Sequence, residues 1–421
     1  MKARAALRLA AACALVVACR PAGPPPRAVR PGLPEAEPRV RVGILVDTPE
    51  AVVTAEAPFE IRVGAAEAGI EAAAGERWVF RADAAGQVTG QGPGGRRVGP
   101  TAGTVSVVPR GDSVVVIGDR RYRGTALIRA ARAGRVTAIN VVDLEAYLLG
   151  VVPREIGVRP EAEIEAVKAQ AVAARTYAVG NLGNRERLGF DFYATVADQV
   201  YGGLADEDPV VSRAVRETRG EIVTYEGLPI LAYYHSTCGG RTAAIEEVWP
   251  RAPLPYLRSV SDAVPGTRDR FYCETSNRFR WTQSWSGSEL SEILRRTLVE
   301  YAGAPRGRVG RILGLSLTGR TQSGRAAALR VETDAGTYVV RGDSIRWVLR
   351  PEPGRLLNSS FIELDVAANN GEVHGASVGG AGWGHGVGMC QVGALGRARA
   401  GQSYREILRA YYQGTRVERI Y

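Results

Sequence analysis

The chain has 421 residues, of which 45% are hydrophobic and 23% charged, and its formal net charge is +10. A chain of this length and composition folds around one large core or two to three ordinary ones, and it is not an intrinsically disordered protein. The positive charge favours an anionic partner surface, but no Lys/Arg-dense tract or aromatic-basic pattern typical of RNA-binding domains occurs, so nucleic acid is not expected as a partner.

The N-terminal segment 1–18 has the pattern of an export signal peptide. It begins with basic residues, continues with an apolar run that is too short for a membrane span, and ends in Val16-Val17-Ala18 before Cys19. That ending resembles the lipobox of bacterial lipoproteins, in which the cysteine is acylated and becomes the mature N-terminus. We therefore expect an exported lipoprotein, anchored to a membrane of the cell envelope on its periplasmic or outer face. The alternative is an ordinary secreted protein.

Residues 19–38 are proline-rich and predict an extended, semi-rigid linker. From 39 to 140, short stretches of alternating hydrophobicity separated by Gly and Pro predict a series of β-strands. The first strong helical pattern follows at DLEAYLLG, residues 143–150.

A longer helix is predicted over 160–180, where Pro160 fits the first turn and acidic residues follow it. Its apolar residues recur at helical spacing as a stripe of mostly small side chains, which allows close packing: Ile164, Val167, Ala171, Ala174 and Ala178. Lys168 and Arg175 are two turns apart and therefore lie on the same side of this helix.

The remaining elements are shorter. A helix is predicted over 209–219, strands over 221–225 and 229–235, and a region of strands and turns over 310–366. Two short helices are expected after the glycine-rich segment GGAGWGHGVGMCQVGA near the C-terminus.

Five segments together resemble the SpoIID/LytB family. They are LEAYLLGVVPREI, EAVKAQAVAARTYAV, AYYHSTCGGRT with VW and PYLRSV behind it, IRWVLR, and GWGHGVGMCQVGALGRARAGQSYREILRAYYQGT. That family includes lytic transglycosylases of the bacterial cell wall, known from sporulation, and enhancers of wall amidases. The resemblance implies an α+β fold with a mixed-sheet core, helices around a cleft, an N-terminal β-rich part and a smaller inserted subdomain.

On this basis we expect one SpoIID/LytB-like domain over residues 39–421. Four parts are expected within it. They are a β-rich part at 39–140, a part with the catalytic motif at 141–240, an inserted β-rich part at 241–370 and a C-terminal part with the GHGVGMCQ motif at 371–421.

Glu155 is the candidate catalytic residue, because the resemblance matches it to the family's catalytic acid. The family more often has Met where this chain has Ile156, but both are apolar. The segment 151–158 predicts an apolar turn, in which burial would raise the pKa of the Glu155 carboxyl toward the value a general acid needs. An Arg154 side chain that turned inward would oppose this rise in pKa. The alternative is that Glu155 is a surface turn residue.

A lytic transglycosylase needs one carboxylate, whereas most glycosidases use two. No second acid stands out near Glu155 in the sequence, since Glu161, Glu163 and Glu165 are typical of a helix start. The sequence therefore favours the mechanism with a single carboxylate.

The other motif residues are candidates for substrate binding: Lys168, Gln170, Arg175, Tyr177 and Tyr201. Arg175 would hold a muramyl carboxylate with two hydrogen bonds, Lys168 and Gln170 would contact sugar hydroxyls or that carboxylate, and Tyr177 and Tyr201 would stack on sugars. Lys168 is the single lysine after the signal peptide, which suggests that a compact ammonium is required there. The alternative for each residue is structural packing.

Three cysteines remain after the signal peptide, Cys238, Cys273 and Cys390, which is an odd number for an exported protein. With His235 and His385 they could supply a structural zinc site in which at most four of the five residues bind the ion. A Cys238–Cys273 disulfide is the alternative, and His385 is alternatively a cleft residue. No cofactor is expected to be required for the chemistry.

Two functions remain open from the sequence. The first is a lytic transglycosylase that acts on peptidoglycan glycan strands and forms 1,6-anhydromuramyl ends. The second is a non-catalytic, wall-binding enhancer of an amidase. The presence of Glu155 together with Lys168, Arg175 and Tyr177 favours the enzyme.

Overall fold

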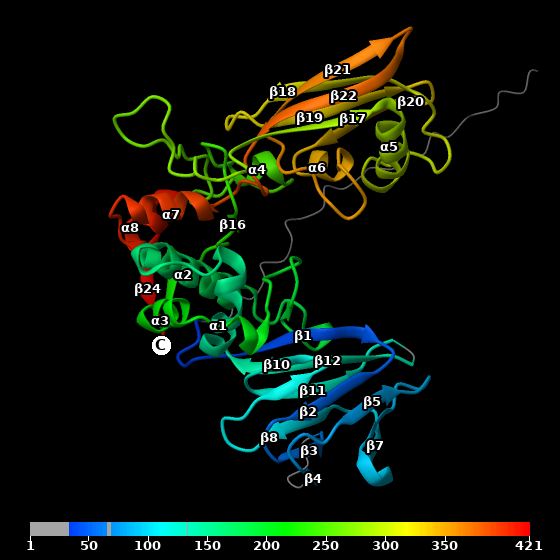
Figure 1. The fold of residues 1–421 in the computed structure, drawn as a ribbon, viewed down its shortest axis with the longest axis vertical. Coiled ribbons are helices and arrows are strands. Elements are labelled where there is room, and N and C mark those ends of the chain that lie inside the picture. The colour runs from blue at the N-terminus through cyan, green and yellow to red at the C-terminus, as the bar shows by residue number, and fades with distance from the viewer. Residues whose placement is uncertain (1–32, 65–68, 133) are drawn as a thin grey trace, which may run out of the picture. The chain divides into compact units, whose positions relative to one another are not determined.

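The computed structural model describes residues 33–64, 69–132 and 134–421. The predicted signal peptide 1–18, Cys19 and most of the 19–38 linker lie outside these residues. Within the described part of the chain, no helix is both long enough and apolar enough to cross a membrane. The fold is α+β, as predicted, with several separate sheets and eight α-helices among the described residues (Figure 1).

The N-terminal part is built from two sheets. The first has the order β13-β1-β12-β11-β8-β3-β4, and its two longest strands, β1 and β12, pair antiparallel. Its strands are β1 (Arg39–Thr48), β3 (Phe59–Val63), β4 (Ile70–Ala72), β8 (Val105–Pro109), β11 (Thr125–Ala130), β12 (Val136–Asp143) and β13 (Phe192–Tyr193). The predicted strand-rich region is confirmed, and β13 joins it from a loop far along the chain.

The second sheet has the order β10-β9-β2-β5-β6-β7. Its strands are β2 (Ala51–Ala55), β5 (Trp78–Ala82), β6 (Val88–Gln91), β7 (Arg97–Thr101), β9 (Val115–Ile117) and β10 (Arg120–Tyr122), with a 3-10 turn η1 (Pro93–Gly95). Alternating buried positions on the two sheets, such as Val53, Trp78 and Ile128, form the apolar core between them.

The helical part is centred on α2 (Ile164–Asn181), which contacts α1 (Leu144–Ile156) and α3 (Pro209–Glu217) as well as α7 (Gln391–Arg399) and α8 (Tyr404–Tyr411) (Figure 1). Because most side chains of α2 are small and buried, neighbouring helices approach it from several sides. The predicted helices near 143–150, 160–180 and 209–219 and at the C-terminus are thereby confirmed.

Short elements complete this part. They are the 3-10 turns η2 (Glu161–Glu163), η3 (Glu186–Leu188) and η4 (Gly203–Asp206), the helix α4 (Ile245–Val248), the sheet β15-β14-β24 (Leu228–Pro229, Glu221–Tyr225 and Arg416–Arg419) and the parallel pair β16 (Tyr234–His235) and β23 (Met389–Cys390). The β16–β23 pair joins segments of chain that are far apart in sequence.

The inserted subdomain has its own core. It consists of the sheets β17-β22-β21 and β18-β19-β20 with two helices. The bounds are β17 (Arg280–Ser286), α5 (Gly287–Tyr301), β18 (Ile312–Arg320), β19 (Ala326–Thr333), β20 (Gly336–Arg341), α6 (Ser344–Val348), β21 (Ile362–Asn369) and β22 (Glu372–Ala381). A capping box of Ser286 and Glu289 begins α5, and Trp281, Leu294 and Leu329 belong to one buried cluster.

One expected boundary differs from the structure. The division between 241–370 and 371–421 falls between β21 and β22, which pair over most of their lengths. Because β22 also pairs with β17, it belongs to the inserted subdomain. The sequence did not reveal this because the partner strand β17 lies far upstream.

Candidate active site

Glu155 lies in the last turn of α1, one residue before the helix ends at Ile156. Gly157 follows with φ 81°, a left-handed conformation that glycine adopts without strain and that ends the helix. The predicted turn is therefore wrong: the helix continues through Pro153. Proline disrupts most helix interiors, but α1 accommodates Pro153 in its last turn.

Two hydrogen bonds hold the Glu155 carboxyl group. The backbone N–H of Val200 donates to Oε1 over 3.0 Å, and the hydroxyl of Tyr234 donates to the same carboxyl group. Tyr234 itself accepts a hydrogen bond from Gln199 Nε2 at 3.0 Å, which leaves its proton free to point at Glu155. Glu155 is thus oriented by groups from two distant segments.

Burial raises the pKa of Glu155 to about 7, although the hydrogen bonds from Val200 and Tyr234 act in the opposite direction. Arg154 does not stabilise the carboxylate, because its side chain is exposed and pairs with Asp206 at 2.6 Å. Near neutral pH, Glu155 is therefore present in both protonation states, as a group that first donates and then accepts a proton requires.

Glu155 lines a cleft of about 400 Å³. Four aromatic side chains and two histidines line the cleft beside Glu155, together with one further carboxyl group, that of Asp198. The other lining residues are Tyr177, Val196, Ala197, Asp198, Val200, Ala232, Tyr233, Tyr234, His235, Ser236, Trp249, His385 and Gln391. No lysine or arginine occurs among these described lining residues. The rings of Tyr177, Tyr233 and Trp249 are suited to a ring-shaped ligand such as a sugar, which can stack on them.

Asp198 is a second carboxylate in the cleft, and no local sequence pattern pointed to it. It accepts hydrogen bonds from the Tyr177 hydroxyl and the Tyr193 backbone N–H, each at 2.9 Å. Arg185 also pairs with it at 2.9 Å, and the Asp198 side chain is 2% exposed. Because its oxygens are occupied, Asp198 holds Tyr177 in place and is not free to act as a second acid or base.

Both cleft histidines are held as neutral rings. Val387 N–H donates to His385 Nδ1 at 3.1 Å, so Nε2 carries the proton and donates to the Tyr234 carbonyl at 3.0 Å. His235 bonds through Nδ1 to the Val387 carbonyl, and its buried Nε2 has no partner among the described residues. Burial lowers the pKa of His385 to about 4 and that of His235 well below its ordinary value.

Lys168 and Arg175 do not line the cleft. Their predicted common side is confirmed, but it faces α3: Lys168 pairs with Glu165 and Glu217, each at 2.8 Å, and Arg175 is 0% exposed. The structure therefore places these two cations in the helical layer and not at the cleft, where the predicted contact with substrate would require them. The sequence shows which residues share a helix side, but not what that side contacts.

Gln170 and Tyr201 are also placed behind the cleft. Gln170 is buried and accepts a hydrogen bond from the cleft residue Gln391 at 3.3 Å. Tyr201 is 4% exposed, packs on Tyr147 and donates to Asn140. Of the five predicted substrate-binding residues, only Tyr177 lines the cleft.

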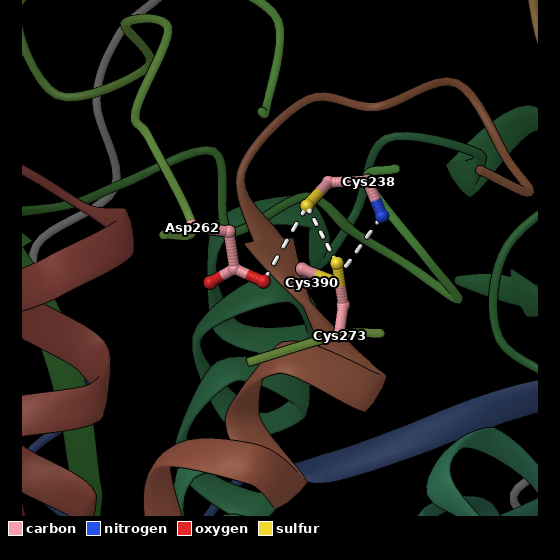
Figure 2. Close-up of side chains that lie close together, drawn as sticks. All are labelled: Cys238, Asp262, Cys273 and Cys390. Carbon is pink, nitrogen blue, oxygen red and sulfur yellow. Dashed lines mark hydrogen bonds between the residues drawn. The ribbon is translucent and has the colours of Figure 1, made fainter. Parts of the chain in front are cut away.

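The three predicted cysteines meet in one buried cluster, and none of the three forms a disulfide in the structure (Figure 2). The fourth member is Asp262, which the sequence analysis missed because no spacing pattern links it to the cysteines. His235 and His385 do not belong to this cluster, since their rings line the cleft and bond to backbone groups. Their predicted role as metal ligands is therefore corrected.

Comparison with known proteins agrees with the motifs. The stage II sporulation protein (SpoIID) family matches residues 132–225, and a domain family of unknown function, DUF8618, matches residues 266–388. The second match covers the whole inserted subdomain from β17 to β22.

Curated relatives extend this similarity. An uncharacterized protein of Brachyspira hyodysenteriae is 34% identical over 280 residues, which are 66% of this chain and 67% of the relative. Stage II sporulation protein D of Bacillus amyloliquefaciens is 30% identical over 295 residues, or 66% of this chain and 75% of the relative. The amidase enhancer of Bacillus subtilis is 30% identical over 290 residues, or 64% of this chain, but the match spans only 40% of that relative. The chain belongs to the SpoIID/LytB family.

Proposed function

We propose that this protein cleaves peptidoglycan glycan strands as a lytic transglycosylase with Glu155 as its single catalytic acid and base. The observation that carries the proposal is the Glu155 carboxyl group in an aromatic cleft, with its pKa raised to about 7 and no other unoccupied carboxylate among the described lining residues. Membership of a family whose relatives are named for sporulation and for an amidase supports a role in the cell wall.

In the first step, protonated Glu155 donates its proton to the glycosidic oxygen between N-acetylmuramic acid and N-acetylglucosamine. The bond from that oxygen to the muramyl anomeric carbon breaks, and the N-acetylglucosamine leaves as an alcohol. Positive character remains on the anomeric carbon, and Glu155 is now a carboxylate.

In the second step, Glu155 takes the proton of the muramyl C6 hydroxyl, whose oxygen bonds to the anomeric carbon and closes the 1,6-anhydro ring. Because the nucleophile is part of the substrate, attack is intramolecular. Well-oriented intramolecular reactions reach effective molarities on the order of 10⁵ M. Glu155 ends the reaction protonated, ready for the next bond, and no second carboxylate is needed.

The cleft supports recognition without a charged contact. Its aromatic rings offer stacking surfaces, and His235 Nε2 is a buried acceptor without a partner among the described residues. A sugar hydroxyl or acetamide N–H is the group that such an acceptor would bind. The proposed substrate contacts therefore come from Tyr177, Tyr233, Trp249 and His235, and not from Lys168 or Arg175.

The decisive experiment is mass spectrometry of purified glycan strands after incubation with the protein. We expect 1,6-anhydromuramyl ends with wild type and a loss of about 10² to 10⁴ in rate with Glu155→Gln, which retains shape but cannot donate the proton. Glu161→Gln is the matched control, because Glu161 is exposed and lies outside the cleft.

A second candidate function is suggested by the similarity to an amidase enhancer. If wild type leaves strands intact, while wild type and Glu155→Gln stimulate an amidase equally, the protein is an enhancer without its own chemistry. Reducing muramyl ends would instead identify a hydrolase.

We also propose that the protein is exported and anchored to a membrane through Cys19, with the 19–38 linker between anchor and domain. The support is the sequence pattern before Cys19. Such an anchor would place the cleft beside the cell wall, where glycan strands occur.

A further inference from the structure

Three cysteines and one aspartate lie close together in the interior: Cys238, Asp262, Cys273 and Cys390 (Figure 2). One ligand atom from each lies within 4.8 Å of all the others, and all four residues are buried. The Cys238 sulfur is 3.4 Å from the Cys273 sulfur and 3.6 Å from Asp262 Oδ2. Two sulfurs bound tetrahedrally to one zinc ion at about 2.3 Å are about 3.8 Å apart, so the spacing is close to that of a zinc site.

The surroundings orient these atoms as they would the ligands of a cation. Asp262 Oδ1 accepts hydrogen bonds from the Tyr411 hydroxyl at 2.7 Å and from Arg397 at 3.4 Å, which leaves Oδ2 facing the sulfurs. Outer hydrogen bonds of this kind fix the orientation of metal-binding carboxylates.

The Cys390 sulfur accepts hydrogen bonds from the backbone N–H groups of Cys238 and Gly393, at 3.2 and 3.3 Å. These two amide donors fix the position of the sulfur beside the other three groups. Gly393 is also needed for space, because a Cβ at this position would lie 2.6 Å from Asp262 Oδ2. The glycine therefore admits the carboxylate to the cluster.

A disulfide accounts for less of this arrangement. A Cys238–Cys273 bond would use two sulfurs and leave Cys390, with its two amide donors, unexplained. It would also leave the 0% exposed Asp262 facing an uncharged sulfur pair. A divalent cation uses all four groups.

We propose that Cys238, Asp262, Cys273 and Cys390 bind one Zn²⁺ ion in a closed, structural site. Three thiolates and a carboxylate are ligands that zinc accepts, and soft sulfur disfavours Mg²⁺ and Ca²⁺. Because four buried protein ligands complete a tetrahedron, no position remains for water or substrate, and the ion takes no part in the chemistry.

The position of the ligands indicates what the ion stabilises. His235 of β16 is paired with Cys390 of β23, and Cys238 follows β16 by three residues. Cys273 precedes the first strand of the inserted subdomain, and Cys390 follows its last strand. The ion therefore ties both ends of the inserted subdomain to the strand that carries Tyr234, the hydrogen-bond partner of Glu155. This inference does not depend on whether Glu155 cleaves glycan.

The test is metal analysis of the full-length protein purified without chelator. We expect about one zinc per chain in wild type and a large loss of zinc in Cys390→Ser and Asp262→Asn. His235→Gln and His385→Gln are the controls: they should retain zinc, because neither ring belongs to the cluster. Loss of zinc in the histidine variants with retention in Asp262→Asn would overturn the ligand set.

Measurements on wild type avoid variants that fail to fold. Replacement of the ion by Co²⁺ should produce thiolate-to-cobalt charge-transfer absorption, and a strong zinc chelator should lower the Tm. Metal-free protein with one disulfide and one free thiol, detected by intact mass and thiol alkylation, would overturn the proposal. Metal-free protein with three free thiols would overturn it as well.

Discussion

The Arg175 guanidinium and the Glu145 carboxylate form a two-pronged ion pair inside the helical layer, with Nε–Oε1 and Nη2–Oε2 distances of 2.8 and 2.7 Å. Arg175 also donates to the backbone carbonyls of Glu221 and Val215, and Tyr421 donates to Glu145. The pair thereby connects α1, α2, α3 and the C-terminal residue. A motif arginine that seemed suited to bind substrate instead holds the helices that support the cleft.

The first prediction concerns this pair. Arg175→Leu leaves the buried Glu145 carboxylate without its partner, and we expect a loss of about 3–5 kcal/mol in the free energy of unfolding. Glu145→Gln combined with Arg175→Leu should recover part of this loss, because no buried charge remains. Denaturant unfolding of the two single variants and the double variant measures the coupling.

Burial alone would raise the pKa of Glu145, but Arg175 and Tyr421 outweigh burial and lower it. Since the folded-state pKa lies below that of the unfolded chain, the ionised pair stabilises the fold above the unfolded-state value, and this contribution is lost as pH falls through the folded-state value. The difference in free energy of unfolding between wild type and the double variant should therefore become smaller as the pH falls. An unchanged stability of Arg175→Leu together with a raised KM for glycan would restore the substrate-binding role.

The second prediction concerns Lys168. The sequence suggested that an ammonium is required, but the ion pairs of Lys168 among the described residues are with the carboxylates of Glu165 and Glu217, which are partly exposed. Arginine reaches the same groups, so Lys168→Arg should change the free energy of unfolding by no more than about 0.5 kcal/mol. Cleavage of glycan strands should also be unchanged. A selective loss of cleavage in a stable Lys168→Arg protein would show that the lysine is needed for function.

The residues near Glu155 show how far sequence reasoning reaches. Val151, Val152 and Ile156 are neighbours along the chain, so an apolar environment and a raised pKa could be predicted. The groups that orient the carboxyl, Val200 and Tyr234, come from other segments and were not predictable from local pattern. The strands 39–140 and the main helices were predictable because hydrophobic periodicity is a local property.

The cysteine cluster shows the same limit. The odd number of thiols predicted a shared role, but the fourth ligand could not be chosen from spacing. The histidines near Cys238 and Cys390 in sequence were the natural candidates, yet both rings line the cleft, His235 from β16 and His385 from the segment before β23. Asp262 reaches the sulfurs because a glycine at position 393 leaves room for it, and this is a tertiary relationship.

The third prediction concerns the membrane anchor. If Cys19 is acylated, its lipid chains contribute about 0.8 kcal/mol per buried methylene to membrane binding. Cys19→Ala should therefore move the protein from the membrane fraction to the soluble fraction of the envelope. Cys13→Ala is the matched control, since Cys13 lies within the apolar part of the signal and should not change the distribution. A Cys19→Ala protein that stays with the membrane would refute the lipoprotein assignment.

The last prediction concerns the pH dependence of cleavage. Burial raises the pKa of Glu155 to about 7, and the acid step requires the protonated form. The value of kcat/KM should therefore fall about tenfold per pH unit well above pH 7. The Tyr234 hydroxyl donates to Glu155 and stabilises the carboxylate. In Tyr234→Phe that donor is lost, the pKa of Glu155 rises further, and the basic limb of the profile should move up by about one pH unit. Rates of anhydromuramyl formation across pH measure the shift. If the limb does not move, the titrating group is not the Glu155 carboxyl held by Tyr234, because loss of the hydroxyl donor raises the pKa of that carboxyl even with the Val200 hydrogen bond in place.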